Sequence, residues 1–305
     1  MMHLYLPVVG MSVNLLLVVA VGAFVGFLSG LVGVGGGFLL TPILMMIGVP
    51  PTMAAASGTC ALVGTSSSAT AAHFRLGNVD VKLGTILLLG GLTGAAIGVQ
   101  VIKLLRALGS AGLAITITYI VVLGSVGGFM LVESVHSLRR GSIKPAPRHK
   151  VQKISLMRRL PLQMEFPRSN VTHPVFFPFL LCALVGILAA IMGVGGGFVM
   201  VPMMVYLLRM PMHVAVGTDL FQILFTCAGV TLMQAATNYT VDIVLALLVA
   251  FGSTVGAQVG ARMSKVLRGE QLKIVLASVV LLTTLKMTIG LFPRPALLLS
   301  SALGN

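Results

Sequence analysis

Apolar residues follow one another along most of this chain in long, nearly unbroken stretches, and they do not alternate with polar residues. Eight stretches approach the ~20 residues that a helix needs to cross the core of a bilayer. They lie at residues 12–32, 53–72, 83–102, 111–132, 175–192, 212–236, 241–261 and 271–293. Because the strands of a membrane β-barrel alternate, the pattern predicts an all-α integral membrane protein with eight full-length helices.

Two further apolar segments are too short to cross a bilayer, and each follows a cluster of glycines. The clusters lie in GLVGVGGGFLLTPIL (30–44) and, 160 residues later, in AIMGVGGGFVMVPMM (190–204). The segments after them, 38–49 and 198–208, hold about a dozen residues each, which is ~18 Å of helix at 1.5 Å per residue. Each half is therefore predicted to form a hairpin of a long helix, a glycine break and a short returning helix, followed by three full helices.

The duplication continues beyond the glycine clusters. The sequence ASGT at 56–59 returns as AVGT at 215–218, and VD at 79–80 returns as VD at 241–242. The two halves are thus homologous, and a basic segment connects them. The predicted organisation is a first membrane repeat (1–132), a loop (133–174) and a second membrane repeat (175–305).

Charge is scarce and unevenly placed. Only 9% of the residues are charged, against ~25% in a soluble domain. The net charge is +14, and nine of the twenty Lys and Arg residues lie in the 133–174 loop. Positive residues favour the cytoplasmic side of a membrane, so a cytoplasmic loop explains the charge and no nucleic-acid partner is expected.

The same rule predicts how the halves are oriented. If each hairpin returns to its starting side, each half makes an odd number of crossings and the second repeat is inverted. Sixteen Lys and Arg residues then lie on the cytoplasmic side and three outside, whereas parallel halves would give twelve and seven. The count favours two inverted repeats with a cytoplasmic loop.

The glycine breaks predict a substrate site. Irregular backbone at membrane depth is tolerated only where protein buries it or where it lines a cavity, and paired breaks in inverted repeats are typical of the site of a secondary transporter. Unpaired N–H groups at the starts of the short helices favour an anion. The alternative, that the glycines only allow close helix packing, stays open. The predicted substrate-binding glycines are Gly33, Gly35, Gly36, Gly37, Gly193, Gly195, Gly196 and Gly197.

Polar side chains near the AxGT segments extend this prediction. Ser57, Thr59 and Thr218 could hydrogen-bond an oxyanion, and Gln222 follows Thr218 by one helical turn. A hydroxyl-rich stretch, TSSSAT, occupies 65–70. Such hydroxyls can instead bond to the carbonyls of their own helix.

Two ionisable residues lie inside apolar stretches, where charge is costly and therefore suggests function. Lys286 could attract an anionic substrate, and Asp219 could be its resting counter-ion or a proton carrier. A structural ion pair, or a Lys286 side chain that extends to the membrane interface, is the alternative.

The two glycine motifs and the AxGT segments resemble those of the TauE/SafE family, also called sulfite exporters, over both halves of the chain. This resemblance implies a bacterial inner-membrane transporter that moves small sulfur-containing or organic anions, such as sulfite or sulfoacetate, usually outward. It also implies that 33–37, 193–197 and the AxGT segments line the substrate path. The 133–174 loop is longer than the short connection of the family.

The expected function is therefore a secondary transporter that exports a small anion (a sulfur oxyanion, a sulfonate or an organic acid), with H⁺ or Na⁺ as a coupling ion. An anion-conducting pore without coupling is the alternative. An enzyme is not expected, because the chain has no HExxH, no GxSxG and no paired carboxylates in one apolar stretch. Its three cysteines lie singly in apolar stretches, so no cofactor or metal is expected.

Overall fold

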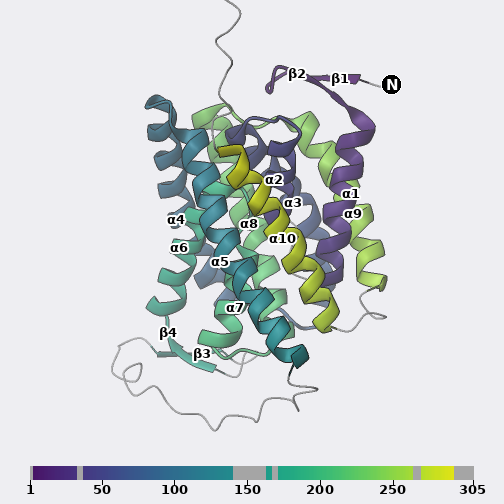
Figure 1. The fold of residues 1–305 in the computed structure, drawn as a ribbon. Helices are drawn as coiled ribbons and strands as arrows, with labels where there is room; N and C mark the ends of the chain where they lie inside the picture. The colour runs from purple at the N-terminus through teal and green to yellow at the C-terminus, as the bar shows by residue number, and fades with distance from the viewer. Residues whose placement is uncertain (1–2, 33–36, 140–162, 167–170, 264–268, 292–305) are drawn as a thin grey trace, which may run out of the picture.

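The computed structural model describes residues 3–32, 37–139, 163–166, 171–263 and 269–291 (Figure 1). Three of the predicted site residues, Gly33, Gly35 and Gly36, lie outside the described residues. Within the described part the chain forms eight long helices. These are α1 (Leu15–Val32), α3 (Pro51–Arg75), α4 (Val81–Ala107), α5 (Ala111–Arg139), α6 (Phe176–Met192), α8 (Met212–Asn238), α9 (Ile243–Met263) and α10 (Gly269–Leu291).

Two short helices complete the helical part. They are α2 (Gly37–Met46) and α7 (Gly197–Pro202), and α7 continues as a π-helical turn, η2 (Met203–Leu207). Both follow the glycine clusters, and both contain a proline, Pro42 or Pro202. Eight long and two short helices match the sequence prediction.

The outer surface of the bundle is apolar. Leu89, Leu247, Phe251 and Leu282 are each at least 60% exposed, which suits contact with lipid. Within the described residues, four helical segments are long and apolar enough to cross a membrane: Val81–Ala107, Ala111–Phe129, Met212–Asn238 and Ile243–Gly260. The protein is thus an all-α membrane protein, as predicted.

Helices of one half pack against helices of the other, and the same type of helix pair occurs twice. Helix α1 packs along α9, and its counterpart α6 packs along α4. Glycines bring these backbones together: a Cβ on Gly26 would lie 2.1 Å from the Ser253 carbonyl oxygen, and one on Gly94 would lie 1.9 Å from the Ala183 carbonyl oxygen. Such contacts replace hydrophobic association inside a bilayer. In the remaining cross-half pairs, α3 packs on α8 and α5 packs on α10.

A short β-hairpin precedes each half, and the sequence analysis did not predict either one. Strands β1 (His3–Leu6) and β2 (Met11–Asn14) pair antiparallel before α1, and β3 (Gln163–Phe166) and β4 (Val171–Pro174) do so before α6. The second hairpin repeats the first at the 160-residue offset of the glycine motif. Figure 1 shows the two hairpins at opposite ends of the bundle.

The ends of the 133–174 segment are structured, which the predicted loop did not include. Helix α5 continues to Arg139, past the predicted boundary at residue 132, and β3 and β4 occupy the other end. The sequence at 133–139, ESVHSLR, contains no glycine or proline, so nothing in it stops the helix.

The second glycine break is a left-handed turn between α6 and α7. Gly193, which ends α6, has φ +73°, and Gly196, which precedes α7, has φ +82°. This region is readily adopted only by glycine. The N–H groups of Val199 and Met200 then donate to the Gly196 carbonyl at 3.0 and 2.9 Å, and the new helix begins.

Candidate functional site

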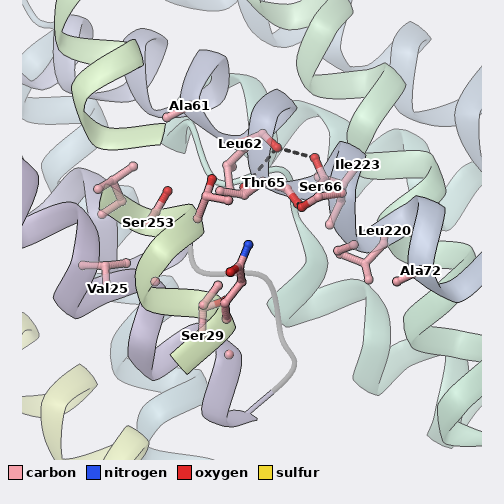
Figure 2. A pocket seen from close by; sticks show the side chains of 18 of the residues that line it. Val25, Ser29, Ala61, Leu62, Thr65, Ser66, Ala72, Leu220, Ile223 and Ser253 are labelled. Carbon is pink, nitrogen blue, oxygen red and sulfur yellow. Dashed lines mark hydrogen bonds between the residues drawn. The ribbon is translucent and has the colours of Figure 1, made fainter. Parts of the chain in front are cut away.

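A cavity of about 510 Å³ lies between α1, α3, α8 and α9 (Figure 2). Its walls come from the C-terminal halves of α1, α3 and α9 and from the N-terminal half of α8. Hydroxyl and amide groups are interspersed with apolar side chains along it. The polar lining residues include Ser29, Thr65, Ser66, Ser253, Thr254 and Gln258.

The cavity runs from one end of the bundle to its interior. Along α3 the lining extends from Ala61 to His73, which is ~18 Å of helix at 1.5 Å per residue. At the inner end it touches Leu40 of α2 and Val194 in the second glycine break. Ala72, near the end of α3, is exposed. We call the end of the bundle where α3 ends and α8 begins the mouth end.

The two short helices meet at their N-terminal ends, beside the inner end of the cavity. The rings of Phe38 and Phe198 stack with centroids 5.6 Å apart and planes 30° apart. A Cβ on Gly37 would lie 3.0 Å from the carbonyl oxygen of Val194. Segments 160 residues apart in the sequence are therefore in contact in the centre of the protein.

The glycines of the second break are tightly packed. A Cβ on Gly193 would lie 2.2 Å from the Ala55 carbonyl oxygen, and a Cβ on Gly196 would lie 2.2 Å from Cγ1 of Val185. Neither position has room for a larger side chain, and the prediction that these glycines bind substrate stays a prediction. Gly195 and Gly197 are also buried, and the break contributes to the cavity through Val194.

The predicted hydroxyls of the AxGT segments join the two halves instead of lining the cavity. The Thr218 Oγ1 accepts a hydrogen bond from the Asp80 N–H at 3.0 Å, and the Ser57 Oγ accepts one from the Asp242 N–H at 3.0 Å. Each AxGT segment therefore contacts the VD motif of the other half. Thr59 donates to the Ala56 carbonyl at 2.7 Å.

The VD aspartates in turn cap the helices that follow them. The Asp80 carboxylate accepts from the Leu83 N–H at 3.2 Å, and the Asp242 carboxylate accepts from the Leu245 N–H at 3.0 Å. Sequence reasoning found both duplicated motifs but missed their pairing. The available signal was that AxGT and VD are duplicated together.

Asp219 and Gln222 are buried on α8 away from the cavity lining. A Cβ on Gly91 of α4 would lie 2.8 Å from Gln222 Nε2 and 3.4 Å from the Cys182 sulfur of α6. The pair therefore lies where α4, α6 and α8 converge. Lys286, in contrast, is exposed on α10 and is outside the lining.

The lining includes residues that the prediction did not name as site residues. Ser29 on α1 and Ser253 on α9 face the same space as the predicted hydroxyl-rich stretch of α3 (Figure 2). Gln258 of α9 also lines the cavity. The hydroxyls of Thr65 and Ser66 both donate to the Leu62 carbonyl, so they bond to their own helix as well as lining the cavity. Ser253 directly follows Gly252, where a Cβ would lie 2.3 Å from the Val19 carbonyl oxygen of α1, and this neighbouring glycine was the signal in the sequence.

At the end of the bundle opposite the mouth, polar groups bridge α4, α6 and α8. Arg106 donates to the Asn238 carbonyl, Asn238 Nδ2 donates to Gln234 Oε1 at 2.6 Å, and Gln234 Nε2 donates to the Ala190 carbonyl at 3.3 Å. These helices are the repeat counterparts of α9, α1 and α3. Hydrogen bonds therefore join the C-terminal parts of α4, α6 and α8. The corresponding parts of α9, α1 and α3 line the cavity.

Comparison with known proteins places the chain. The sequence model of the family described as sulfite exporter TauE/SafE matches residues 18–287. The chain belongs to this family. The probable membrane transporter protein YjnA of Bacillus subtilis is 26% identical over 282 residues, which cover 91% of this chain and 100% of the relative.

Two further relatives extend the comparison to other lineages. The probable membrane transporter protein MJ0441 of Methanocaldococcus jannaschii is 26% identical, with 86% of this chain and 91% of the relative covered. Sulfite exporter TauE/SafE family protein 3 of Arabidopsis thaliana is 30% identical over 39% of this chain and 26% of its own length. No solved structure matches the chain. The TauE/SafE protein described here is thus a multi-pass member of a family of membrane transporters, not of enzymes.

Proposed function

We propose that this protein is a secondary transporter that exports a small anion, namely a sulfur oxyanion, a sulfonate or an organic acid, with H⁺ or Na⁺ as the coupling ion. The observation that carries the proposal is the cavity that leads from the mouth end to the point where the short helices α2 and α7 meet. A volume of about 510 Å³ falls in the usual range for small-molecule sites. Broken helices meeting between duplicated halves are typical of secondary transporters.

The lining chemistry supports an oxyanion. Of the described lining residues, His73 is the only titratable one, so no carboxylate among them repels an anion. The side chains of Ser29 and Gln258 make no hydrogen bond with other described residues. A hydroxyl offers one donor and a carboxamide offers two, and these donors suit sulfonate, sulfite or carboxylate oxygens.

The charge distribution supports a cytoplasmic mouth. Arg75 and Lys82 flank the α3–α4 connection at the mouth end, and Arg209 lies three residues before α8 there. Lys103 and Arg106 lie in the last turns of α4, at the other end. With positive residues inside, the mouth and the 133–174 loop face the cytoplasm, the repeats are inverted across the inner (plasma) membrane, and the conformation is open to the inside.

The proposal is tested by flux measurements with purified protein in liposomes. Labelled sulfite, thiosulfate, sulfonates and carboxylates are offered in turn, with and without imposed gradients of pH and Na⁺. A transporter shows saturable flux, and the same anion on the opposite side accelerates that flux. An uncoupled pore, the second candidate, shows flux that rises linearly with concentration and does not respond to the opposite side. Flux of none of these anions would refute the proposed function.

A further inference from the structure

Helix α8 presents two different faces to its surroundings. Val216, Leu220 and Ile223 line the cavity. Gln222 faces α4, where a Cβ on Gly91 would touch its amide, and Asp219, three residues before it, lies between the Gln222 side and the lining residues of the helix. Asp219 is 2% exposed and Gln222 is 0% exposed. An ionisable side chain is thus fully enclosed directly behind the cavity wall.

Two oxygen atoms in this pair have no donor. Gln222 Nε2 donates to Thr226 Oγ1 at 3.0 Å. The other amide atom, Gln222 Oε1, and Asp219 Oδ1 make no hydrogen bond within the described chain. Side chains three apart on a helix are neighbours, so the Asp219 carboxyl and the Gln222 amide are adjacent on α8. Buried polar atoms are normally satisfied, and exceptions require an explanation.

The surroundings supply no positive charge to an ionised Asp219. The titratable groups that face it are the thiols of Cys182 on α6 and Cys227 on α8. Asp80, at the start of α4, is bonded through its N–H to Thr218, the residue before Asp219. The Asp80 carboxylate accepts a hydrogen bond from the Leu83 N–H. No ion pair to Asp219 occurs among the described residues. An unpaired carboxylate ion in such a place is strongly disfavoured.

We propose that Asp219 and Gln222 form a proton site, in which the protonated Asp219 carboxyl donates its O–H to Gln222 Oε1. One added proton removes both unsatisfied acceptors at once. A metal cation fits less well, because hard cations take six or more oxygen ligands and this pair offers few. The inference rests on the proposed function in one respect: it makes H⁺ the coupling ion of the transporter.

The position of the pair connects protonation to conformation. Asp219 lies where α4, α6 and α8 converge, in the half of α8 nearer the mouth end, and the Arg106–Asn238–Gln234 bridge joins the same helices ~22 Å further along α8. Separation of these helices would admit water to Asp219 and allow it to lose its proton. The repeat counterpart of Asp219 on α3 is Cys60, so only one half carries this carboxylate. Separation of α4, α6 and α8 and release of one proton are therefore linked.

The first test is the ratio of anion flux with a pH gradient to flux without one, in liposomes. Asp219→Asn is the variant, because an amide keeps the shape of the acid and can donate to Gln222 Oε1. The ratio is expected to fall from the wild-type value to about one, because the substitution removes the free energy that couples anion transport to the pH gradient. Asp242→Asn is the matched control: Asp242 is also buried, but the Val8 and Leu245 N–H groups bond to its carboxylate. This control keeps the wild-type ratio.

A second measurement does not depend on transport. Infrared spectra of the purified protein at neutral pH should contain a carboxylic-acid C=O band that Asp219→Asn removes and Asp242→Asn retains. The absence of that band, an unchanged flux ratio in Asp219→Asn, or flux driven by Na⁺ and not by pH would each overturn the proton site. If wild-type protein moves none of the anions while the band is present, the proposed function has failed and protonated Asp219 stands.

Discussion

The two sides of the bundle use the same arrangement of helices but differ in packing. On one side, α1, α3 and α9 surround the cavity, and serine and threonine side chains face it (Figure 2). On the other, the counterparts α6, α8 and α4 are in contact, and the Arg106–Asn238–Gln234 bridge joins their ends. The cavity of the first side reaches Val194 in the second glycine break, whereas a hollow of about 490 Å³ on the second side is lined by α4 and α8 alone. We call the two sides the open side and the closed side.

Side chains at corresponding positions explain part of this difference. Leu62 of α3 lines the cavity, whereas its counterpart on α8 is Phe221. Phe221 packs on α4, where a Cβ on Gly84 would lie 2.8 Å from its ring, and its ring centroid is 5.1 Å from that of Phe225. At this position the second copy thus carries the larger side chain, and that side chain packs between α8 and α4.

The largest effect is expected from Gly196→Leu. The substitution adds a side chain at φ +82°, where Cγ1 of Val185 is 2.2 Å from the new Cβ. Left-handed strain of about 1–2 kcal/mol adds to overpacking of about 1–3 kcal/mol, so transport should be lost and thermal stability lowered. The measurements are liposome flux and a melting curve in detergent. Gly128→Leu on α5, which has open space around it, is the control. Normal flux through well-expressed Gly196→Leu would show that transport does not require the left-handed turn between α6 and α7.

Filling the open side should have the next largest effect. Ala69 lines the cavity on α3, and Ala69→Trp would occupy much of the space beside Thr65 and Ser253. We expect flux to fall by roughly tenfold or more, since lost contacts of about 1.4 kcal/mol already change binding tenfold. Ala71→Trp, at an exposed position outside the lining, should change little. Equal loss in both variants would mean that the cavity is not the substrate path.

Loosening the closed side should have a smaller effect. Arg106→Ala removes the hydrogen bond to the Asn238 carbonyl, and a hydrogen bond to a charged group contributes about 1.5–3 kcal/mol. The buried thiol of Cys182 on α6 should then react with a thiol reagent roughly tenfold faster, as more molecules open on this side. The assay uses protein in which Cys60 and Cys227 are replaced by serine. Lys103→Ala, an exposed position on the same helix, is the control, and faster labelling there too would point to general loosening.

The smallest effect is expected from Lys286→Met. Lys286 is exposed on α10 outside the cavity lining, and exposed charges contribute about 0–1 kcal/mol. Flux should therefore change less than about fivefold and should match that of Lys103→Met. The prediction that Lys286 attracts the substrate would be supported by a clear loss of flux in Lys286→Met alone.

Much of the fold was predictable because its signals are local. The length of each apolar stretch predicted eight long helices, and the glycine clusters predicted the breaks before α2 and α7. The β-hairpins were missed because strands of four residues have little periodicity to detect. The end of α5 was missed because a helix can extend beyond its apolar stretch into polar sequence.

The candidate site was less predictable. The apolar runs and the duplicated motifs determine an all-helical membrane protein with two matching halves, since these properties depend on neighbouring residues and on repetition. The contact of Ser57 with Asp242, and the common cavity that Ser29 and Gln258 share with α3, depend on which helices pack across the halves. That choice is made by shape complementarity between residues far apart in the sequence, as when Gly26 admits the backbone of Ser253. No segment read alone contains it.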